Sequence, residues 1–216
     1  QALKIACEQR GVQVIEHAEV DAFEVEGERV ATVHTTAGSF SAEHFCLAAG
    51  AWTTQLTQQL GCAMPVKPIR GQMALLQTEE QLLQTVVHQG GHYLIPRLDG
   101  RVLVGSTLED VGFEKKTTLF AIEQLLQFAQ TRVPRLRDAA VESCWAGFRP
   151  ASPDGYPFID AVPGFANAWV AAGHYRWGLF LSPGTAVLMR QLIQREDTVL
   201  PYDDFRIGRI AESIVQ

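Results

Sequence analysis

The chain has 216 residues, of which 47% are hydrophobic and 19% are charged, and its formal net charge is −6. This composition is that of a globular protein and excludes a disordered chain. The negative charge argues against nucleic acid or an anionic membrane surface as a partner. The sequence contains no run of about 18 apolar residues, which is the length that a membrane-spanning helix needs.

The first residues predict a helix without a start signal of its own. Apolar residues recur at helical spacing over residues 1–10, and Gly11 is a natural helix stop. No capping residue precedes Gln1, so we expect the chain to be a fragment that lacks a preceding segment. Val12–Ile15 follows as a predicted short strand, and the order helix, glycine, strand is typical of an α/β unit.

The next segment predicts a hairpin. Two alternating runs, Ala22–Val25 and Val30–Thr35, flank Gly27, and a further turn is expected at Gly38.

Two predicted strands end in the same Ala-Ala-Gly sequence. The strand His44–Ala49 leads into Gly50, and the later strand Ala168–Ala172 leads into Gly173. Small residues at strand ends let a ligand come close, and ligands of open α/β sheets bind beyond the carboxyl ends of the strands. A tight turn under a packed helix, here Trp52–Leu60, is the structural alternative.

From Met64 the pattern becomes that of an antiparallel sheet with one covering helix. The helix is amphipathic, with Thr117 or Thr118 as its cap and Pro134 after its end. A tight turn at Leu98–Arg101 joins two of the strands. The expected elements are the strands Pro65–Gln77, Gly91–Pro96, Arg101–Thr107 and Ala140–Phe148 and the helix Thr118–Val133.

The end of the chain returns to the α/β pattern. Strands at Pro157–Ile159 and Ala168–Ala172 precede a helix from about Gly178 to Arg195. Pro183 must lie near the start of this helix, because deeper in the helix it would remove a backbone hydrogen bond.

The predicted fold class is therefore mixed, with α/β and α+β character and two domains. Residues 1–62 and 149–216 form one α/β domain, and the antiparallel sheet and helix of residues 63–148 are inserted into it.

Two arginines, Arg149 and Arg176, stand among residues that are otherwise apolar. A guanidinium is always charged and is rarely buried without a partner. Two of them in one apolar region suggest a site for an anion, most naturally a carboxylate gripped by the planar fork. The alternative is that each arginine forms a structural ion pair or lies over an aromatic neighbour such as Tyr175, Trp177 or Phe148.

The sequence contains none of the common short motifs for phosphate binding, dinucleotide binding, zinc-dependent proteolysis or serine hydrolysis. The sequence has no phosphate loop G-x-x-x-x-G-K-[ST], no G-x-G-x-x-G, no H-E-x-x-H and no G-x-S-x-G. The six histidines lack metal-ligand spacing, so no metal site is expected. The four cysteines form no C-x-x-C pair, and Cys46 and Cys144 lie in apolar runs, which predicts buried free thiols and a cytoplasmic location.

Five segments occur in a characteristic order: AAGAWTTQL, PVKPIRGQM, HYLIPRLDGRVLVGST, WAGFRPASPDGYPFID and AAGHYRWGLFLSPGT. In this order they resemble the later part of the FAD-dependent D-amino acid oxidase superfamily, and they are most similar to its glycine oxidase branch, the thiamine-biosynthesis oxidases. The resemblance implies that residues 1–62 and 149–216 belong to a Rossmann-like FAD-binding domain and that residues 63–148 roof the substrate. The family's N-terminal glycine loop and first βαβ unit are missing from this sequence.

The resemblance also assigns site residues. Arg149 matches the arginine that grips the substrate carboxylate, Tyr93 the tyrosine whose hydroxyl supports it, and Arg176 a position near both substrate and flavin. Val20 matches a contact of the adenine end, and Leu108 a pocket position that varies within the family. The implied cofactor-binding residues are Val20, Ala49, Gly50, His174, Tyr175, Arg176, Trp177, Gly178, Leu179 and Phe180.

The implied chemistry is the oxidation of a small amino acid, glycine or a D-amino acid, with FAD as cofactor. Hydride passes from the amino acid to the flavin, the imine hydrolyses to an α-keto acid and ammonia, and molecular oxygen is reduced to hydrogen peroxide. Two alternatives stay open: a dehydrogenase of the same fold that passes electrons to a quinone, and a non-catalytic carboxylate-binding module. A homo-oligomer is compatible with each of them.

Overall fold

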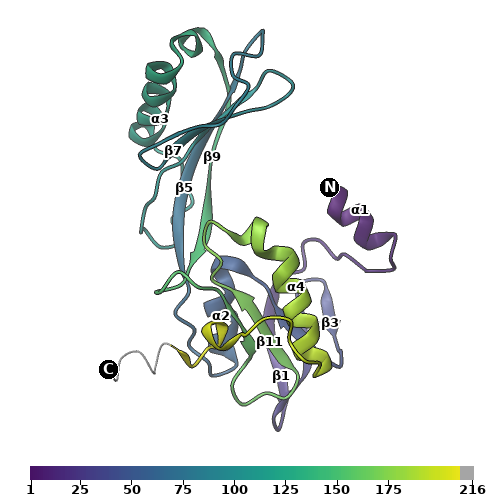
Figure 1. Ribbon diagram of the computed structural model, residues 1–216. Helices are drawn as coiled ribbons and strands as arrows, with labels where there is room; N and C mark the ends of the chain where they lie inside the picture. Colours follow the sequence, from purple (N-terminus) through teal and green to yellow (C-terminus); the bar gives the residue numbers. More distant parts are fainter. Residues whose placement is uncertain (210–216) are drawn as a thin grey trace.

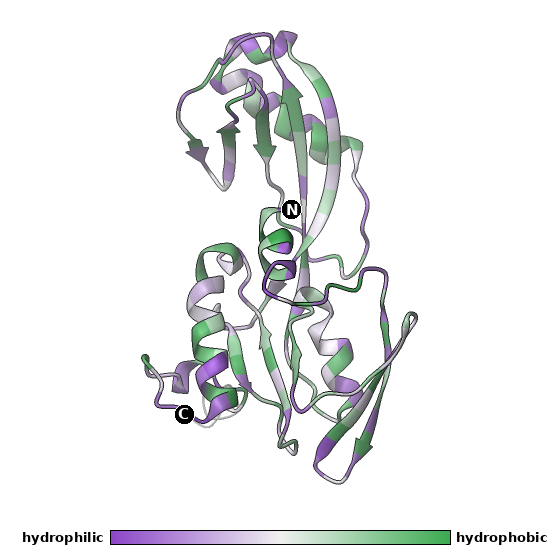
Figure 2. Ribbon diagram, turned by 90° about the vertical axis from the view of Figure 1, so that its right-hand side faces the viewer, coloured by the Kyte–Doolittle hydropathy of each residue, from purple (hydrophilic) through white to green (hydrophobic). Residues whose placement is uncertain are grey.

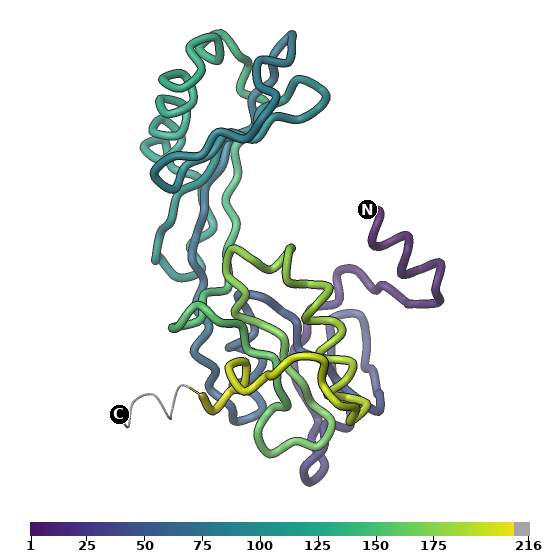
Figure 3. The backbone as a smooth tube through the Cα atoms, in the orientation of Figure 1, coloured from purple at the N-terminus to yellow at the C-terminus, as the bar shows by residue number. Residues whose placement is uncertain are grey.

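The computed structural model of the protein describes residues 1–209. An upper part is built on one antiparallel sheet, and a lower part holds two smaller sheets (Figure 1). The chain rises along β5 and returns along β9, which lie side by side and connect the two parts (Figure 3). The mixed fold predicted from the sequence is confirmed, whereas the residue limits of the two domains stay a prediction.

The upper sheet has five antiparallel strands in the order β6-β7-β8-β5-β9, and helix α3 packs on one of its faces. The long strands β5 and β9 pair from Lys67↔Ala151 to Gln77↔Ala140. The elements of this part are β5 (Lys67–Gln77), β6 (Val87–Gln89), β7 (His92–Pro96), β8 (Val102–Gly105), α3 (Leu119–Arg132), η2 (Pro134–Asp138) and β9 (Ala140–Ala151).

The lower part contains two three-stranded sheets. One is the predicted hairpin extended by a third strand, in the order β1-β2-β3, and the other has the order β10-β11-β4. Helix α4 contacts strands β10 and β11. The elements of this part are α1 (Ala2–Glu8), β1 (Val20–Glu26), β2 (Arg29–Thr35), β3 (Gly38–Phe40), β4 (Phe45–Leu47), η1 (Gly50–Trp52), α2 (Thr53–Gln59), β10 (Phe158–Ala161), β11 (Ala168–Ala172), α4 (Gly178–Gln194) and η3 (Asp203–Phe205).

Each part has its own apolar core. In the upper part, Leu125 of α3 packs with Leu94 and Val104 on the sheet. In the lower part, Phe158 and Val170 pack between the two small sheets. Apolar and polar residues alternate along α3 and α4, as expected of helices with one buried face (Figure 2).

The predicted signals for α3 are confirmed. The helix begins after Thr118, whose hydroxyl accepts a hydrogen bond from the backbone N–H of Ala121 at 3.4 Å, and it ends before Pro134. The two Ala-Ala-Gly strands belong to one sheet. Strand β11 runs parallel to β4, so that Gly50 and Gly173 follow strand ends at the same sheet edge.

Two local predictions are wrong, and one short strand was not predicted. Val12–Ile15 is exposed coil, because no strand of the described chain pairs with it and an unpaired strand leaves its backbone groups without partners. Gly38 lies in strand β3, and the turn falls at Thr36 and Ala37. Strand β6 was not predicted, since three residues are too short to show an alternating pattern.

The expectation of buried thiols is also wrong. Cys46 is exposed and Cys144 is half-buried. Strand β4, which carries Cys46, lies at the edge of its sheet, and so a side chain on its open face reaches the surface. Partial burial still raises the pKa of both thiols.

Pro183 lies within the first two turns of α4 and deprives the carbonyl of Leu179 of its usual backbone donor. The hydroxyl of Ser182 donates to this carbonyl at 2.9 Å instead. The helix therefore continues through the proline without leaving that carbonyl unpaired.

Asn167 joins the two lower sheets. Its side chain is buried, Oδ1 accepts from the backbone N–H of Val30 at 2.9 Å, and Nδ2 donates to the Val30 carbonyl at 2.8 Å. Its own carbonyl accepts from the backbone N–H of Phe45 at 2.8 Å. One residue before β11 thus connects β2 to the sheet that contains β4.

Replacing this amide tests the connection. Asn167→Ala leaves the N–H and the carbonyl of Val30 buried without partners, and we expect a loss of about 2–4 kcal/mol in the free energy of unfolding. Urea denaturation measures the change. Ser39→Ala, which removes an exposed hydrogen bond to His34, serves as the control and should cost less than about 0.5 kcal/mol; equal losses for the two variants would contradict the prediction.

Candidate functional site

One face of the upper sheet brings two of the predicted site residues together. Tyr93 pairs with Gly105, Gly105 with Met73, and Met73 with Trp145 across four neighbouring strands. Directly paired residues point to the same face, and so do alternate residues along a strand. Arg149, four positions after Trp145 on β9, therefore shares this face with Tyr93.

The side chain of Arg149 crosses β5 at Gly71. A Cβ atom at Gly71 would lie only 2.2 Å from Nη1 of Arg149, so the guanidinium occupies the space that any larger residue would fill. Nη2 donates to the hydroxyl of Ser106 at 2.5 Å, and Nη1 donates to the carbonyl of Thr107 at 3.3 Å. The guanidinium is thus held flat on the sheet at the end of β8.

The ring of Tyr93 occupies the corresponding space above Gly105. A Cβ atom at Gly105 would lie 2.8 Å from the Tyr93 hydroxyl oxygen and 2.7 Å from a ring carbon. Ser106 follows Gly105 directly. The phenol therefore approaches the end of β8 from β7, and the guanidinium approaches it on the same face from β9 across β5. The two glycines make this approach possible.

Arg149 has no acidic partner within 4 Å among residues 1–209, so the ion-pair alternative is wrong for this residue. Arg176 likewise forms no ion pair there, but its guanidinium lies 5.8 Å from the ring centre of Tyr175, as the aromatic alternative expects. The neutral acceptors of Arg149 leave its positive charge uncompensated. Such a group can bind an anion from solution.

The loop before α4 is attached to the end of β9. His174 forms a β-bridge with Ala151, and the backbone N–H of Tyr175 donates to the carbonyl of Pro150 at 2.8 Å. These contacts place Arg176 beside the strand end that follows Arg149. The structure therefore brings both predicted arginines to the junction of the upper and lower parts.

The start of α4 has the charge and the apolar surface of an anion-binding helix start. Trp177 is the N-cap residue, and its side chain makes no capping bond, so the first backbone N–H groups have no side-chain acceptor. A helix start of this kind favours negative charge. Trp177, Leu179 and Phe180 beside it are exposed, and they offer apolar contacts to a planar ring system.

His174 stabilises this helix start from within. Its Nε2 atom lies 2.9 Å from the Thr185 hydroxyl, about two turns into α4. Burial lowers the pKa of His174, which favours the neutral ring at neutral pH.

The other predicted cofactor residues lie in the lower part. Ala49 and Gly50 follow the carboxyl end of β4, beside the loop that begins at Gly173. Val20 opens strand β1 and packs against the lower apolar core, so the structure accounts for it as a packing residue. Leu108 is 49% exposed and lies between Thr107 and Glu109.

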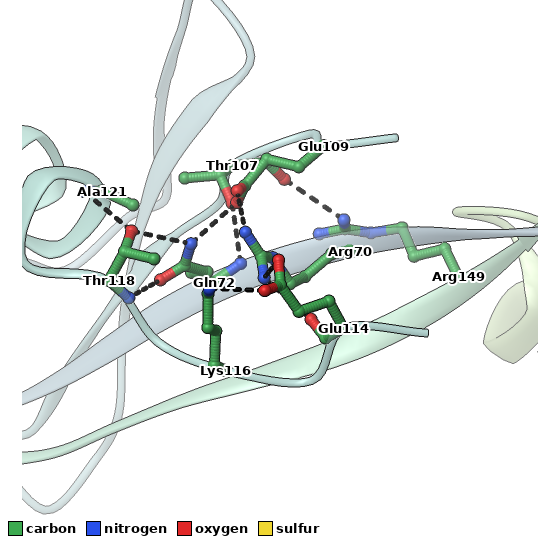
Figure 4. A network of polar contacts seen from close by, with 9 residues as sticks. All are labelled: Arg70, Gln72, Thr107, Glu109, Glu114, Lys116, Thr118, Ala121 and Arg149. Carbon is green, nitrogen blue, oxygen red and sulfur yellow. Dashed lines mark hydrogen bonds and ion pairs between the residues drawn. The ribbon is translucent and has the colours of Figure 1, made fainter. Parts of the chain in front are cut away.

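A buried polar network on the opposite face of the sheet was missed by the sequence analysis (Figure 4). Arg70 is 3% exposed and pairs with Glu109 at 2.5 Å and with Glu114 at 3.3 Å. Gln72 is fully buried, and its Nε2 atom donates to Glu109 at 2.9 Å. The available signal was a charged and an amide residue at alternate positions of the otherwise apolar segment 69–76.

Opposing effects act on Glu109. Burial acts to raise its pKa, but hydrogen bonds from Arg70, Thr107 and Gln72 outweigh burial and hold the pKa below its usual value. The carboxylate is therefore ionised in the folded protein at neutral pH.

Residues 1–209 hold neither a metal-ligand cluster nor a membrane-spanning helix. No group of three or more His, Cys, Asp or Glu side chains is arranged to hold a metal ion. None of the helices there has the length and apolar character to cross a membrane. A hollow of about 580 Å³ lies at the far end of β5, lined in part by Gln77, Thr78 and Arg135, and it contains none of the predicted site residues.

The ionisation of Glu109 predicts a pH-dependent contribution to stability. Its folded pKa lies below the unfolded value of about 4.3, so the contribution is full above that pH and is lost as the pH falls further. Glu109→Gln should cost about 1 kcal/mol at pH 7, discounted because the side chain keeps some solvent access, and the difference from the unsubstituted protein should shrink below pH 4. Thermal unfolding at several pH values measures it; a difference that grows in acid would contradict the prediction.

Comparison with known proteins gives the family. Residues 1–192 match the family described as DAO, FAD dependent oxidoreductase. The chain is 41% identical over 189 residues to glycine oxidase from Pseudomonas putida, which covers 88% of this chain and 52% of that protein. It is 37% identical over 213 residues to hydrogen cyanide synthase subunit HcnC from Pseudomonas protegens, which covers 96% of this chain and 50% of that protein.

The crystal structure of glycine oxidase from Geobacillus kaustophilus has the same fold. It matches with a TM-score of 0.90 and 32% identity, and the match covers 96% of this chain and 56% of that one. The chain thus spans about half the length of the relatives it matches. The predicted resemblance is confirmed, and the chain belongs to the family of FAD-dependent oxidoreductases.

Proposed function

We propose that the chain is the substrate-binding part, together with a portion of the flavin-binding part, of an oxidase of a small amino acid such as glycine. The observation that carries this proposal is the Arg149 guanidinium, which is held flat on the sheet by two neutral acceptors and has no acidic partner in the described chain. The names of the glycine oxidase relatives support the choice of substrate.

The substrate carboxylate would bind across Arg149. The planar fork offers paired N–H donors that match the two carboxylate oxygens. The Tyr93 hydroxyl, above Gly105 and beside the segment that holds the guanidinium, would donate a further hydrogen bond to the same carboxylate. These two contacts fix one end of the amino acid, and orientation of the α-carbon follows from them.

The residues at the start of α4 would hold the flavin ring. Trp177, Gly178, Leu179 and Phe180 present open N–H groups and apolar side chains, and Arg176 adds a positive charge between this helix and the carboxylate site. These residues would hold FAD, which would supply an acceptor for the hydride of the α-carbon and a route for the electron pair to oxygen, with release of hydrogen peroxide. The resulting imino acid hydrolyses to an α-keto acid and ammonia.

In this scheme the residues of the chain place charges around the substrate and the flavin, and none of them forms a covalent bond with the substrate. Arg149 neutralises the substrate carboxylate, and the helix start favours the negative charge that collects on the ring during reduction. The cytoplasmic location and the homo-oligomeric state stay predictions from the sequence.

Arg149→Lys tests the carboxylate site. The variant keeps the charge but loses the fork, and since one charged hydrogen bond is worth roughly 1.5–3 kcal/mol, the KM for glycine should rise about tenfold or more. The melting temperature should change little, because Ser106 and Thr107 are neutral and no unpaired charge is left behind. Peroxide release measures turnover in the full-length, FAD-loaded protein.

The exposed Arg97 provides a control, since Arg97→Lys should leave KM and stability unchanged. A large fall in melting temperature with unchanged KM for Arg149→Lys would make Arg149 a structural residue. Turnover with a quinone dye but none with oxygen would overturn the oxidase assignment.

Gly71→Ala tests the position of the guanidinium with no change at Arg149. The added methyl group would meet Nη1 at 2.2 Å and Cζ at 2.6 Å, so the flexible side chain must move away. We expect the KM for glycine to rise about tenfold, the cost of one displaced charged contact. Gly147, paired with Gly71 on β9, has open space at the same point, and Gly147→Ala is the matched control. Equal effects of the two substitutions would contradict the prediction.

A further inference from the structure

The acceptors of Arg149 lie on a bulge between β5 and β8. Regular pairing of the two strands ends at Met73↔Gly105, and a single bridge, Arg70↔Glu109, follows. Between these points three residues, 106 to 108, face two residues, 71 and 72. The extra residue turns the Ser106 hydroxyl and the Thr107 carbonyl toward the guanidinium, in the manner of bulges that re-aim groups beside a site.

The side chain of Thr107 holds the bulge from the opposite side. Its Oγ1 atom accepts from the backbone N–H of Gln72 at 2.9 Å and donates to a carboxylate oxygen of Glu109 (Figure 4). The same Glu109 oxygen accepts from Nε2 of Gln72 at 2.9 Å. The other Glu109 oxygen accepts from Nη2 of Arg70 at 2.5 Å.

One residue therefore connects the two faces of the sheet. The carbonyl of Thr107 accepts from Arg149 on the open face, while its hydroxyl bonds Glu109 and Gln72 on the buried face. Neither Glu109 nor Gln72 shares the face of Arg149, because Arg70 and Gln72 alternate with Gly71 along β5. In the described residues, the hydrogen bonds that connect Glu109 to Arg149 run through Thr107 in the bulge.

We infer that Thr107 and Glu109 are positioning residues that set the carboxylate affinity of Arg149 from the far side of the sheet. This inference rests on the proposed function. Without the Thr107 hydroxyl, the bulge loses its hydrogen bonds to Gln72 and Glu109 and can move. The Ser106 hydroxyl and the Thr107 carbonyl are then no longer held in position for the guanidinium. The rate of hydride transfer, once the substrate is bound, depends less on this support.

The test uses the FAD-loaded protein and a pair of variants at one position. Thr107→Val removes the hydroxyl at nearly constant volume, whereas Thr107→Ser keeps it. We expect Thr107→Val to raise the Kd for glycolate, a carboxylate probe, and the KM for glycine about tenfold, with a much smaller change in kcat. Thr107→Ser should restore both values to near those of the unsubstituted protein.

Two further variants separate positioning from general stability. Glu109→Gln should act in the same direction as Thr107→Val and gives a second route if that variant folds poorly. Glu114→Gln is the matched control, because Glu114 also pairs with Arg70 but bonds neither Thr107 nor Gln72. The reaction of Arg149 with phenylglyoxal, followed by peptide mass spectrometry, should be faster in Thr107→Val and Glu109→Gln and unchanged in Glu114→Gln.

The outcomes distinguish this inference from the proposed function. If glycolate binds the unsubstituted protein and neither Thr107→Val nor Glu109→Gln changes binding or Arg149 reactivity, the inference is overturned and the proposed function stands. If the unsubstituted protein binds no glycolate yet Arg149 reacts faster in Thr107→Val, the proposed function fails and the positioning role stands. Equal effects of Glu114→Gln and Glu109→Gln would also overturn the inference.

Discussion

The register of β5 against β9 is the constraint on which the rest of the site depends. The pairing of Gly71 with Gly147 and of Ile69 with Arg149 places the guanidinium beside the one position of β5 that has no side chain. A slip of β9 by one residue would turn Arg149 to the face covered by α3, which already holds Arg70 and its ion pairs. The same long pairing carries the chain between the two parts of the molecule (Figure 3).

The two faces of this sheet differ in whether the charge of their arginine is compensated by carboxylates. On the buried face, Arg70 is compensated by Glu109 and Glu114, since an unpaired charge there would be costly. On the open face, the acceptors of Arg149 within residues 1–209 are a hydroxyl and a carbonyl, so its charge remains available for a ligand. Segment 106–109 bonds Arg149 on the open face and Arg70 on the buried face. The ion pairs on the buried face therefore help to fix the position of the Arg149 guanidinium on the open face.

The junction below β9 connects this sheet to α4, the helix proposed to hold the flavin. The bond from Tyr175 to Pro150 and the bridge between His174 and Ala151 attach the start of α4 to the strand that carries Arg149. A ligand held by its carboxylate at Arg149 would thus have its other end near α4. The distance between Arg149 and the start of α4 is set by the hydrogen bonds that join residues 150–151 to residues 174–175.

The sequence by itself determined the elements whose signals are local. The cap at Thr118 and the stop at Pro134 define α3, and the alternation of β1 and β2 defines their hairpin, because such signals depend on near neighbours. The sequence also singled out Arg149, since a guanidinium in an apolar segment needs an explanation.

Only the tertiary structure decided which residues meet across long separations. It joined β4 to β11 in parallel, left Val12–Ile15 unpaired, and exposed Cys46 on an edge strand, because strand pairing is a property of two segments and not of one. The tertiary structure also distinguished a free Arg149 from a paired Arg70, although both stand in apolar strands. Their difference lies in which face of the sheet each side chain meets, and that is fixed only when β5 and β9 pair.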